Sequence, residues 1–76
     1  MPSAYVLLNT EIGAEAEVLE ALKKVDGIQE VFNLWGVYDI IARIKVDTME
    51  RLSRIVNEKL NIGKVHSKLT VVVTET

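Results

Sequence analysis

The chain has 76 residues, of which 9 are basic, 11 are acidic and one is histidine, so its formal net charge at pH 7 is −2. A chain of this length forms one small domain, residues 1–76, whose core leaves little net stability unless a partner adds buried surface. Because cysteine is absent, a disulfide framework, a zinc cluster and a thiol nucleophile are excluded. The basic residues are dispersed, so direct contact with nucleic acid is not expected.

The sequence carries no targeting signal and no membrane segment. No basic segment precedes an apolar stretch at its start, and no run approaches the roughly 18 apolar residues that a membrane span requires. We therefore expect an untargeted cytoplasmic protein that needs no metal or other cofactor.

The spacing of apolar residues predicts six elements. In chain order they are a strand at residues 4–9, a helix at 14–25, a strand at 28–34, a strand at 38–46, a helix at 49–60 and a strand at 65–74. Asp26-Gly27 closes the first helix, with the glycine available for a left-handed cap. Asp47 followed by Glu50 resembles a capping box at the start of the second helix. The residues 35–37 leave room only for a hairpin between the second and third strands.

This order predicts an α+β fold of the ferredoxin-like type, βαββαβ. Right-handed crossovers place both helices on one face of a four-stranded antiparallel sheet. The first and last strands are apolar on both sides, so the open sheet face should be hydrophobic and too large to leave in water. We therefore expect a homodimer in which two sheets pack face to face, as in a dimeric α/β barrel.

The hairpin turn carries the densest polar and aromatic chemistry of the chain, in the sequence Trp35-Gly36-Val37-Tyr38-Asp39. Together with the element order and a valine-rich last strand that contains Thr70, this turn resembles the effector-binding domain of the Lrp/AsnC family, also called the RAM domain. The resemblance spans nearly the whole chain, and its most specific part is the turn from Gly36 to Asp39.

The resemblance implies a regulatory role. Family members usually carry an N-terminal helix-turn-helix DNA-binding domain, and this chain resembles a stand-alone version without one. Their sheets dimerise, four dimers often form an octamer, and an amino acid or similar small effector binds between dimers. The residues implied in effector binding are Trp35, Gly36, Val37, Tyr38, Asp39, Lys68 and Thr70. Lys68 stands where one of two threonines is expected, so it either pairs with an effector carboxylate or fills the cleft.

These residues also have structural explanations. Asp39 either accepts a hydrogen bond from an effector's ammonium group or binds nearby backbone amides, as turn aspartates commonly do. Gly36 either admits an effector or supplies a positive φ. Trp35 and Tyr38 wall a pocket or an oligomer interface, or pack in the core. His66, the one imidazole, is more simply surface or interface packing than a catalytic group.

We expect a non-enzymatic module that senses a small molecule, or that joins full-length Lrp/AsnC-type regulators and alters their assembly on DNA. The alternative is a small enzyme or stress protein of the dimeric α/β-barrel type, for example a monooxygenase-like one. Such an enzyme would hold its substrate between sheet and helices and use His66 or Tyr38 as a proton carrier. The sequence offers no acid–base pair or metal constellation to support it.

Overall fold

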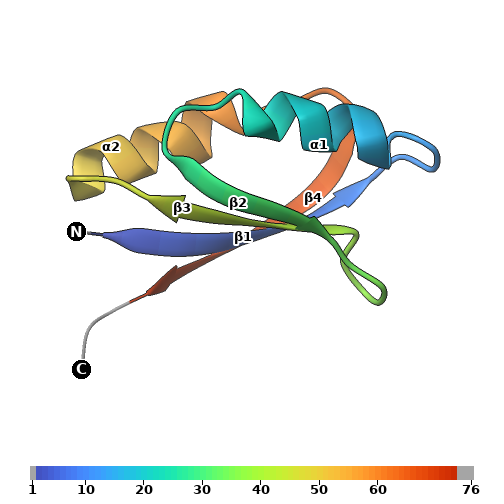
Figure 1. The fold of residues 1–76 in the computed structure, drawn as a ribbon, viewed down its shortest axis with the longest axis horizontal. Helices are drawn as coiled ribbons and strands as arrows, with labels where there is room; N and C mark the ends of the chain where they lie inside the picture. The colour runs from blue at the N-terminus through green and yellow to red at the C-terminus, as the bar shows by residue number, and fades with distance from the viewer. Residues whose placement is uncertain (1, 74–76) are drawn as a thin grey trace.

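The structure, a computed structural model that describes residues 2–73, is a four-stranded sheet covered on one face by helices (Figure 1). Its elements are β1 (Ser3–Thr10), α1 (Glu15–Lys23), β2 (Ile28–Asn33), β3 (Ile40–Lys45), α2 (Met49–Arg54), the π-helical segment η1 (Ile55–Lys59) and β4 (Val65–Val73). The strands are antiparallel in the order β2-β3-β1-β4. The predicted ferredoxin-like fold is therefore confirmed. Thr74, the predicted end of the last strand, lies outside the described residues.

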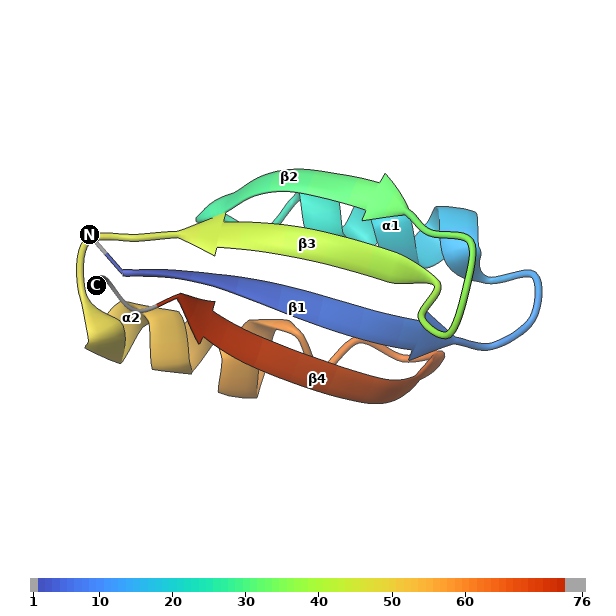
Figure 2. The same ribbon diagram turned by 90° about the horizontal axis from the view of Figure 1, so that it is seen from below.

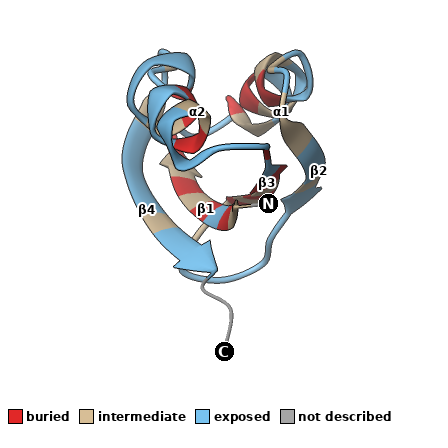
Figure 3. Cartoon of the chain, turned by 90° about the vertical axis from the view of Figure 1, so that its left-hand side faces the viewer, coloured by how far each residue is buried: buried red, intermediate tan, exposed pale blue. Residues whose placement is uncertain are grey.

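The core lies between the sheet and the helices (Figure 3). Alternate residues of the two central strands point into it and are fully buried, namely Ala4, Val6 and Leu8 in β1 and Ile40, Ala42 and Ile44 in β3. The helical layer adds Val18 and Leu22 from α1 and Leu52 from α2. The alternation predicted for the third strand is therefore confirmed, because a pleated strand sends successive side chains to opposite faces.

The connection from α1 to β2 depends on a glycine. The helix ends at Lys23 with Lys24 as its C-cap, so the prediction that Gly27 caps the helix directly was wrong. Gly27 has a φ of +103°, and a Cβ there would lie 2.8 Å from Ile55 Cδ1 and 2.9 Å from Val46 Cγ1. Only glycine satisfies both the backbone conformation and the close approach of the helical layer.

The start of α2 also differs from the sequence prediction. Thr48 is the N-cap, and its hydroxyl accepts a hydrogen bond of 3.1 Å from the Arg51 backbone amide. The predicted capping box of Asp47 and Glu50 was therefore wrong by one position. Thr48 takes the extended backbone conformation that an N-cap residue requires, so its hydroxyl meets the otherwise unpaired amide.

The face of the sheet opposite the helices is open (Figure 2). The most exposed of its large apolar side chains, at 40% to 55%, are Tyr5, Phe32, Leu69, Val71 and Val73. The expected hydrophobic open face is thus confirmed for the described residues. In the single chain β1 is buried on one face only, so its expected burial on both faces needs a further copy of the chain. The dimer itself stays a prediction.

Candidate effector site

The loop between β2 and β3 is longer than predicted. β2 ends at Asn33 and β3 begins at Ile40, so Tyr38 and Asp39 belong to the loop and not to the strand. Its base is closed by a hydrogen bond of 2.8 Å from the Leu34 amide to the Asp39 carbonyl. The Asp39 amide donates to the Leu8 carbonyl at 2.9 Å, which fastens the loop to β1. The loop therefore has a fixed base and a projecting tip, visible at the right of Figures 1 and 2.

Asp39 has a structural role within the chain. Its Oδ2 atom accepts a hydrogen bond of 2.9 Å from the backbone amide of Thr10, a residue that is only 7% exposed. This bond satisfies a buried donor at the end of β1. Among the described residues, the Oδ1 atom of Asp39 accepts no side-chain or backbone hydrogen bond. One oxygen is thus used by the fold and the other is available to a ligand.

The tip of the loop is exposed. The side chains of Trp35 and Val37 are 103% and 85% exposed, so Trp35 does not pack in the core of its own chain. Gly36 has a φ of +155°, and a Cβ there would meet nothing within 4 Å. Within one chain, Gly36 is therefore required by its backbone conformation and not by a close approach. Tyr38 is half-buried beside it.

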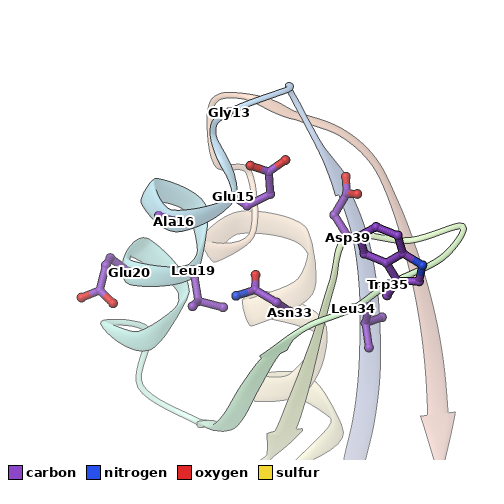
Figure 4. A pocket seen from close by; sticks show the side chains of 9 residues that line it. All are labelled: Gly13, Glu15, Ala16, Leu19, Glu20, Asn33, Leu34, Trp35 and Asp39. Carbon is purple, nitrogen blue, oxygen red and sulfur yellow. The ribbon is translucent and has the colours of Figure 1, made fainter.

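A hollow of about 520 Å³ lies between the tip and α1 (Figure 4), and we call it the hairpin hollow. It is lined by Gly13, Glu15, Ala16, Leu19, Glu20, Asn33, Leu34, Trp35 and Asp39. In Figure 4 the side chains of Leu19 and Asn33 face each other across it, while Glu20 turns outward and pairs with Lys23 at 3.1 Å. The lining contains carboxylates and no cation, so the hairpin hollow favours a positively charged group over an anion.

The residues from α1 were missed by sequence reasoning. Glu15 and Leu19 fall within the helix predicted at residues 14–25, but neither was predicted to line a site. The usable signal is topological, because a helix that directly precedes β2 by a right-handed crossover must lie near the strand that leads into the hairpin.

The last-strand candidates lie at another edge of the sheet. Lys68 and Thr70 belong to β4, which is separated from β2 by both central strands. Lys68 Nζ donates a hydrogen bond of 2.7 Å to the Val56 carbonyl in η1, and the half-buried Thr70 is paired with Val6. Neither lines the hairpin hollow. Within one chain the structure therefore brings Trp35 and Asp39 to one hollow but does not join them to Lys68 or Thr70.

His66 is exposed and lies near Lys68, in a different hollow from the hairpin loop that contains Tyr38. No group of three or more His, Asp or Glu side chains in the described part of the chain is placed to hold a metal ion. Within residues 2–73, no helix combines the length and the apolar character needed to cross a membrane.

One ion pair joins α1 to the start of β4. Lys64 Nζ lies 3.0 Å from Glu17 Oε1, and this hydrogen bond, with the attraction of the carboxylate, raises the pKa of Lys64 above 10.5. The Lys64 carbonyl also accepts a hydrogen bond of 2.8 Å from the Glu11 amide. These contacts fix the segment that precedes the last strand.

Known proteins resemble this chain in sequence and in fold. Residues 3–76 match the family model of the Lrp/AsnC ligand binding domain. The HTH-type transcriptional regulator FL11 of Pyrococcus abyssi is 30% identical over 73 residues, which are 96% of this chain and 48% of that protein, so the chain spans about half of that curated relative. The crystal structure of FFRP-DM1 has a TM-score of 0.92 and 28% identity, over 97% of this chain and 100% of that one. The regulator NMB0573 of Neisseria meningitidis, solved as an L-Met complex, has a TM-score of 0.79 over 97% of this chain and 50% of that one, and its 17% identity indicates a common fold alone.

Proposed function

The chain belongs to the Lrp/AsnC ligand-binding domain family, and we propose that it is a non-enzymatic cytoplasmic module that senses a small effector, most simply an amino acid, by assembling with further copies of itself. The family is one of transcriptional regulators, and a relative of twice this length is an HTH-type regulator. The chain then acts on transcription through full-length regulators with which it assembles, and not by its own contact with DNA.

The observation that carries this proposal is the separation of the candidate residues. The hairpin loop is fastened to β1 through Asp39, whereas Lys68 and Thr70 lie on β4, on the other side of β1, and neither lines the hairpin hollow. We infer that a site using both groups is completed when the hairpin tip of one copy meets the last strand of another. The full exposure of Trp35 supports such a contact, because aromatic side chains are enriched at interfaces.

The first step of assembly is a dimer formed through the open sheet face. Burying a few hundred Å² of the apolar side chains there, at about 25 cal/mol per Å², contributes several kcal/mol. A domain of this size has a net stability of about 4–11 kcal/mol, at roughly 0.05–0.15 kcal/mol per residue. The free energy gained by burying the open face is therefore comparable to the net stability of the whole domain, which favours the dimer over the monomer. Dimers then join through their hairpin ends, and four of them form an octamer.

An amino acid fits the charge of the hairpin hollow. Asp39 retains an unused carboxylate oxygen, and Glu15 lies nearby, so an effector's ammonium group finds a charge-assisted acceptor there. The L-Met complex of NMB0573 supports amino acids as the effector class. The effector stabilises whichever assembly completes its site, by thermodynamic linkage.

Ligand-dependent melting against the twenty amino acids tests the sensing role. At a free ligand concentration of 100 times Kd, the expected stabilisation is about 2.7 kcal/mol, which is a measurable rise in Tm. At least one amino acid should raise Tm, and no rise with any of them would contradict the proposal.

Light scattering tests the assembly with a matched pair of exposed apolar side chains. Trp35→Ala should reduce the mass of assemblies larger than a dimer. Met49 is the first residue of α2, which lies at the other end of the molecule from the hairpin loop (Figure 1), and its side chain is 54% exposed. Met49→Ala should leave that mass unchanged. A protein that is monomeric at micromolar concentration, or a Trp35→Ala variant that assembles like the unaltered chain, would contradict the proposed assembly.

A further inference from the structure

A hollow of about 430 Å³ lies in the helical layer, where the end of α1 meets α2 and η1, and we call it the basic hollow. It is lined by Lys24, Val25, Asp26, Arg51, Arg54 and Lys59. Four of the nine basic residues of the chain therefore border one hollow, although they are dispersed in the sequence. With four cations and one carboxylate, the lining has a formal charge of +3.

The two lysines of the basic hollow are not neutralised. Lys24 and Lys59 are exposed, and no carboxylate of residues 2–73 lies within ion-pair distance of either. Cations at the C-terminus of a helix complement its dipole, which accounts for a lysine at the end of α1 and another at the end of η1. The dipole acts within one helix, however, and does not account for the meeting of both lysines at one hollow.

The two arginines stand between the basic hollow and the other carboxylates of the helical layer. Arg51 Nη2 donates a hydrogen bond of 2.6 Å to Asp26 Oδ2, and its Nη1 lies 3.6 Å from Asp47 Oδ1. Arg54 has longer ion pairs, of 3.5 and 3.9 Å, with the glutamates one turn before and one turn after it. Of these carboxylates, only Asp26 belongs to the lining. Because a guanidinium has five N–H donors, each arginine keeps donors for a further acceptor.

The basic hollow is separate from both proposed assembly surfaces. It lies in the helical layer, and the open sheet face is on the opposite side of the molecule (Figures 1 and 3). The hairpin loop projects from the far end of the molecule relative to α2 (Figure 1). A ligand in the basic hollow therefore competes neither with the packing of two sheets nor with contacts of the hairpin tip.

We propose that the basic hollow binds a small anion that carries a phosphate or pyrophosphate group. Such a group brings multiple negative charges and several acceptor oxygens, which suit two unneutralised lysines and the forked donors of two arginines. A volume of about 430 Å³ is within the range of small-molecule sites. The carboxylates that flank the hollow on α2 repel the long phosphate backbone of a nucleic acid, so the small ligand is favoured. This site is independent of the effector site at the hairpin and goes beyond the proposed function.

Calorimetric titration with inorganic phosphate and with pyrophosphate, at an ionic strength held constant with chloride, tests this site. One saturable site per chain is expected for pyrophosphate. Lys24→Met and Lys59→Met should each weaken its affinity about tenfold, the value of one charge-assisted contact. Lys23→Met is the matched control, because Lys23 is also exposed but pairs with Glu20 and does not line the hollow. That variant should bind within about twofold of the unaltered chain, since solvent and salt screen a charge outside the site.

A variant that strengthens binding separates the site from any loss of folding. Asp26→Ala removes the one carboxylate of the lining and releases Arg51, so pyrophosphate should bind several-fold more tightly. Absence of saturable binding, or lysine variants that bind like the unaltered chain, would overturn the inference. Succinate that binds as tightly as pyrophosphate would overturn the phosphate assignment, and a Lys24-dependent preference for duplex DNA would overturn the assignment to a small ligand.

Discussion

The two roles of Asp39 are separable by a pair of substitutions. Asp39→Ala removes the acceptor for the Thr10 amide, which lies in a residue only 7% exposed. Leaving a buried donor unpaired costs about 1–3 kcal/mol. Asp39→Asn keeps a side-chain oxygen for that amide and loses only the charge, so its expected cost is about 1 kcal/mol, the difference between a charged and a neutral hydrogen bond. The alanine variant should therefore unfold at a clearly lower urea concentration than the asparagine variant.

Effector binding should respond differently. The second oxygen of Asp39 is the proposed acceptor of an ammonium group, and Asp39→Asn removes its charge while it retains the contact with Thr10. Loss of a charge-assisted bond of about 1.5–3 kcal/mol corresponds to roughly a 10- to 100-fold weaker affinity. The asparagine variant should thus be folded and deficient in binding.

Urea unfolding followed by circular dichroism, at one protein concentration for all variants, measures the stability. Calorimetric titration with the amino acid that raises Tm measures the affinity. If Asp39→Ala is as stable as the unaltered chain, the Thr10 bond does not support the fold. If Asp39→Asn binds as tightly as the unaltered chain, its carboxylate takes no part in effector recognition.

Three further predictions concern the framework. Gly27→Ala should cost more than about 2 kcal/mol in urea unfolding, because strain at a positive φ adds to overpacking against Ile55 and Val46. Gly13→Ala, at a φ of +86° with nothing within 4 Å, should cost only about 1–2 kcal/mol. Equal losses in the two variants would contradict the close approach at Gly27. Thr48→Ala should lose about 1 kcal/mol in thermal unfolding, and an unchanged Tm would contradict its role as N-cap. The ion pair of Lys64 with Glu17 stabilises the fold fully below pH 10.5, and this stabilisation is lost as the pH rises through the higher pKa of Lys64 in the folded state. Urea unfolding at increasing alkaline pH should therefore show a loss of stability that is smaller in Glu17→Gln. An identical pH dependence in that variant would contradict the role of the pair.

Local burial explains why most of the fold was predictable from the sequence. The alternation at Ile40, Ala42 and Ile44 and the helical spacing of Val18 and Leu22 are read from neighbouring residues alone, and the structure buries all of them. Element order then restricts the topology to a few arrangements. The resemblance carried by the turn from Gly36 to Asp39 and by Thr70 indicated the family, which residues 3–76 match.

The grouping of residues at the hairpin loop and at η1 escaped prediction because it depends on long-range contacts. Asp39 looks like the start of a strand, yet its bonds to Leu8 and Thr10 place it in the loop, and both partners are about thirty residues away in sequence. The π-helical turn is likewise held by Lys68, 12 residues beyond Val56. Neither contact leaves a periodic trace in the sequence. The sequence therefore supplied candidate residues for the site, but it did not predict how the structure groups them.

The separation of the two candidate groups leads to a last prediction, about dilution. The hairpin hollow contains Asp39, whereas Lys68 and Thr70 lie on β4 and are no part of its lining. If one amino acid uses both groups from different copies, its apparent affinity must fall when the assembly is diluted below its own dissociation constant. If each chain binds its effector alone, dilution has no such effect. Equilibrium binding measured above and below the assembly midpoint distinguishes these cases, and an amino-acid affinity independent of dilution would show that each chain binds its effector alone.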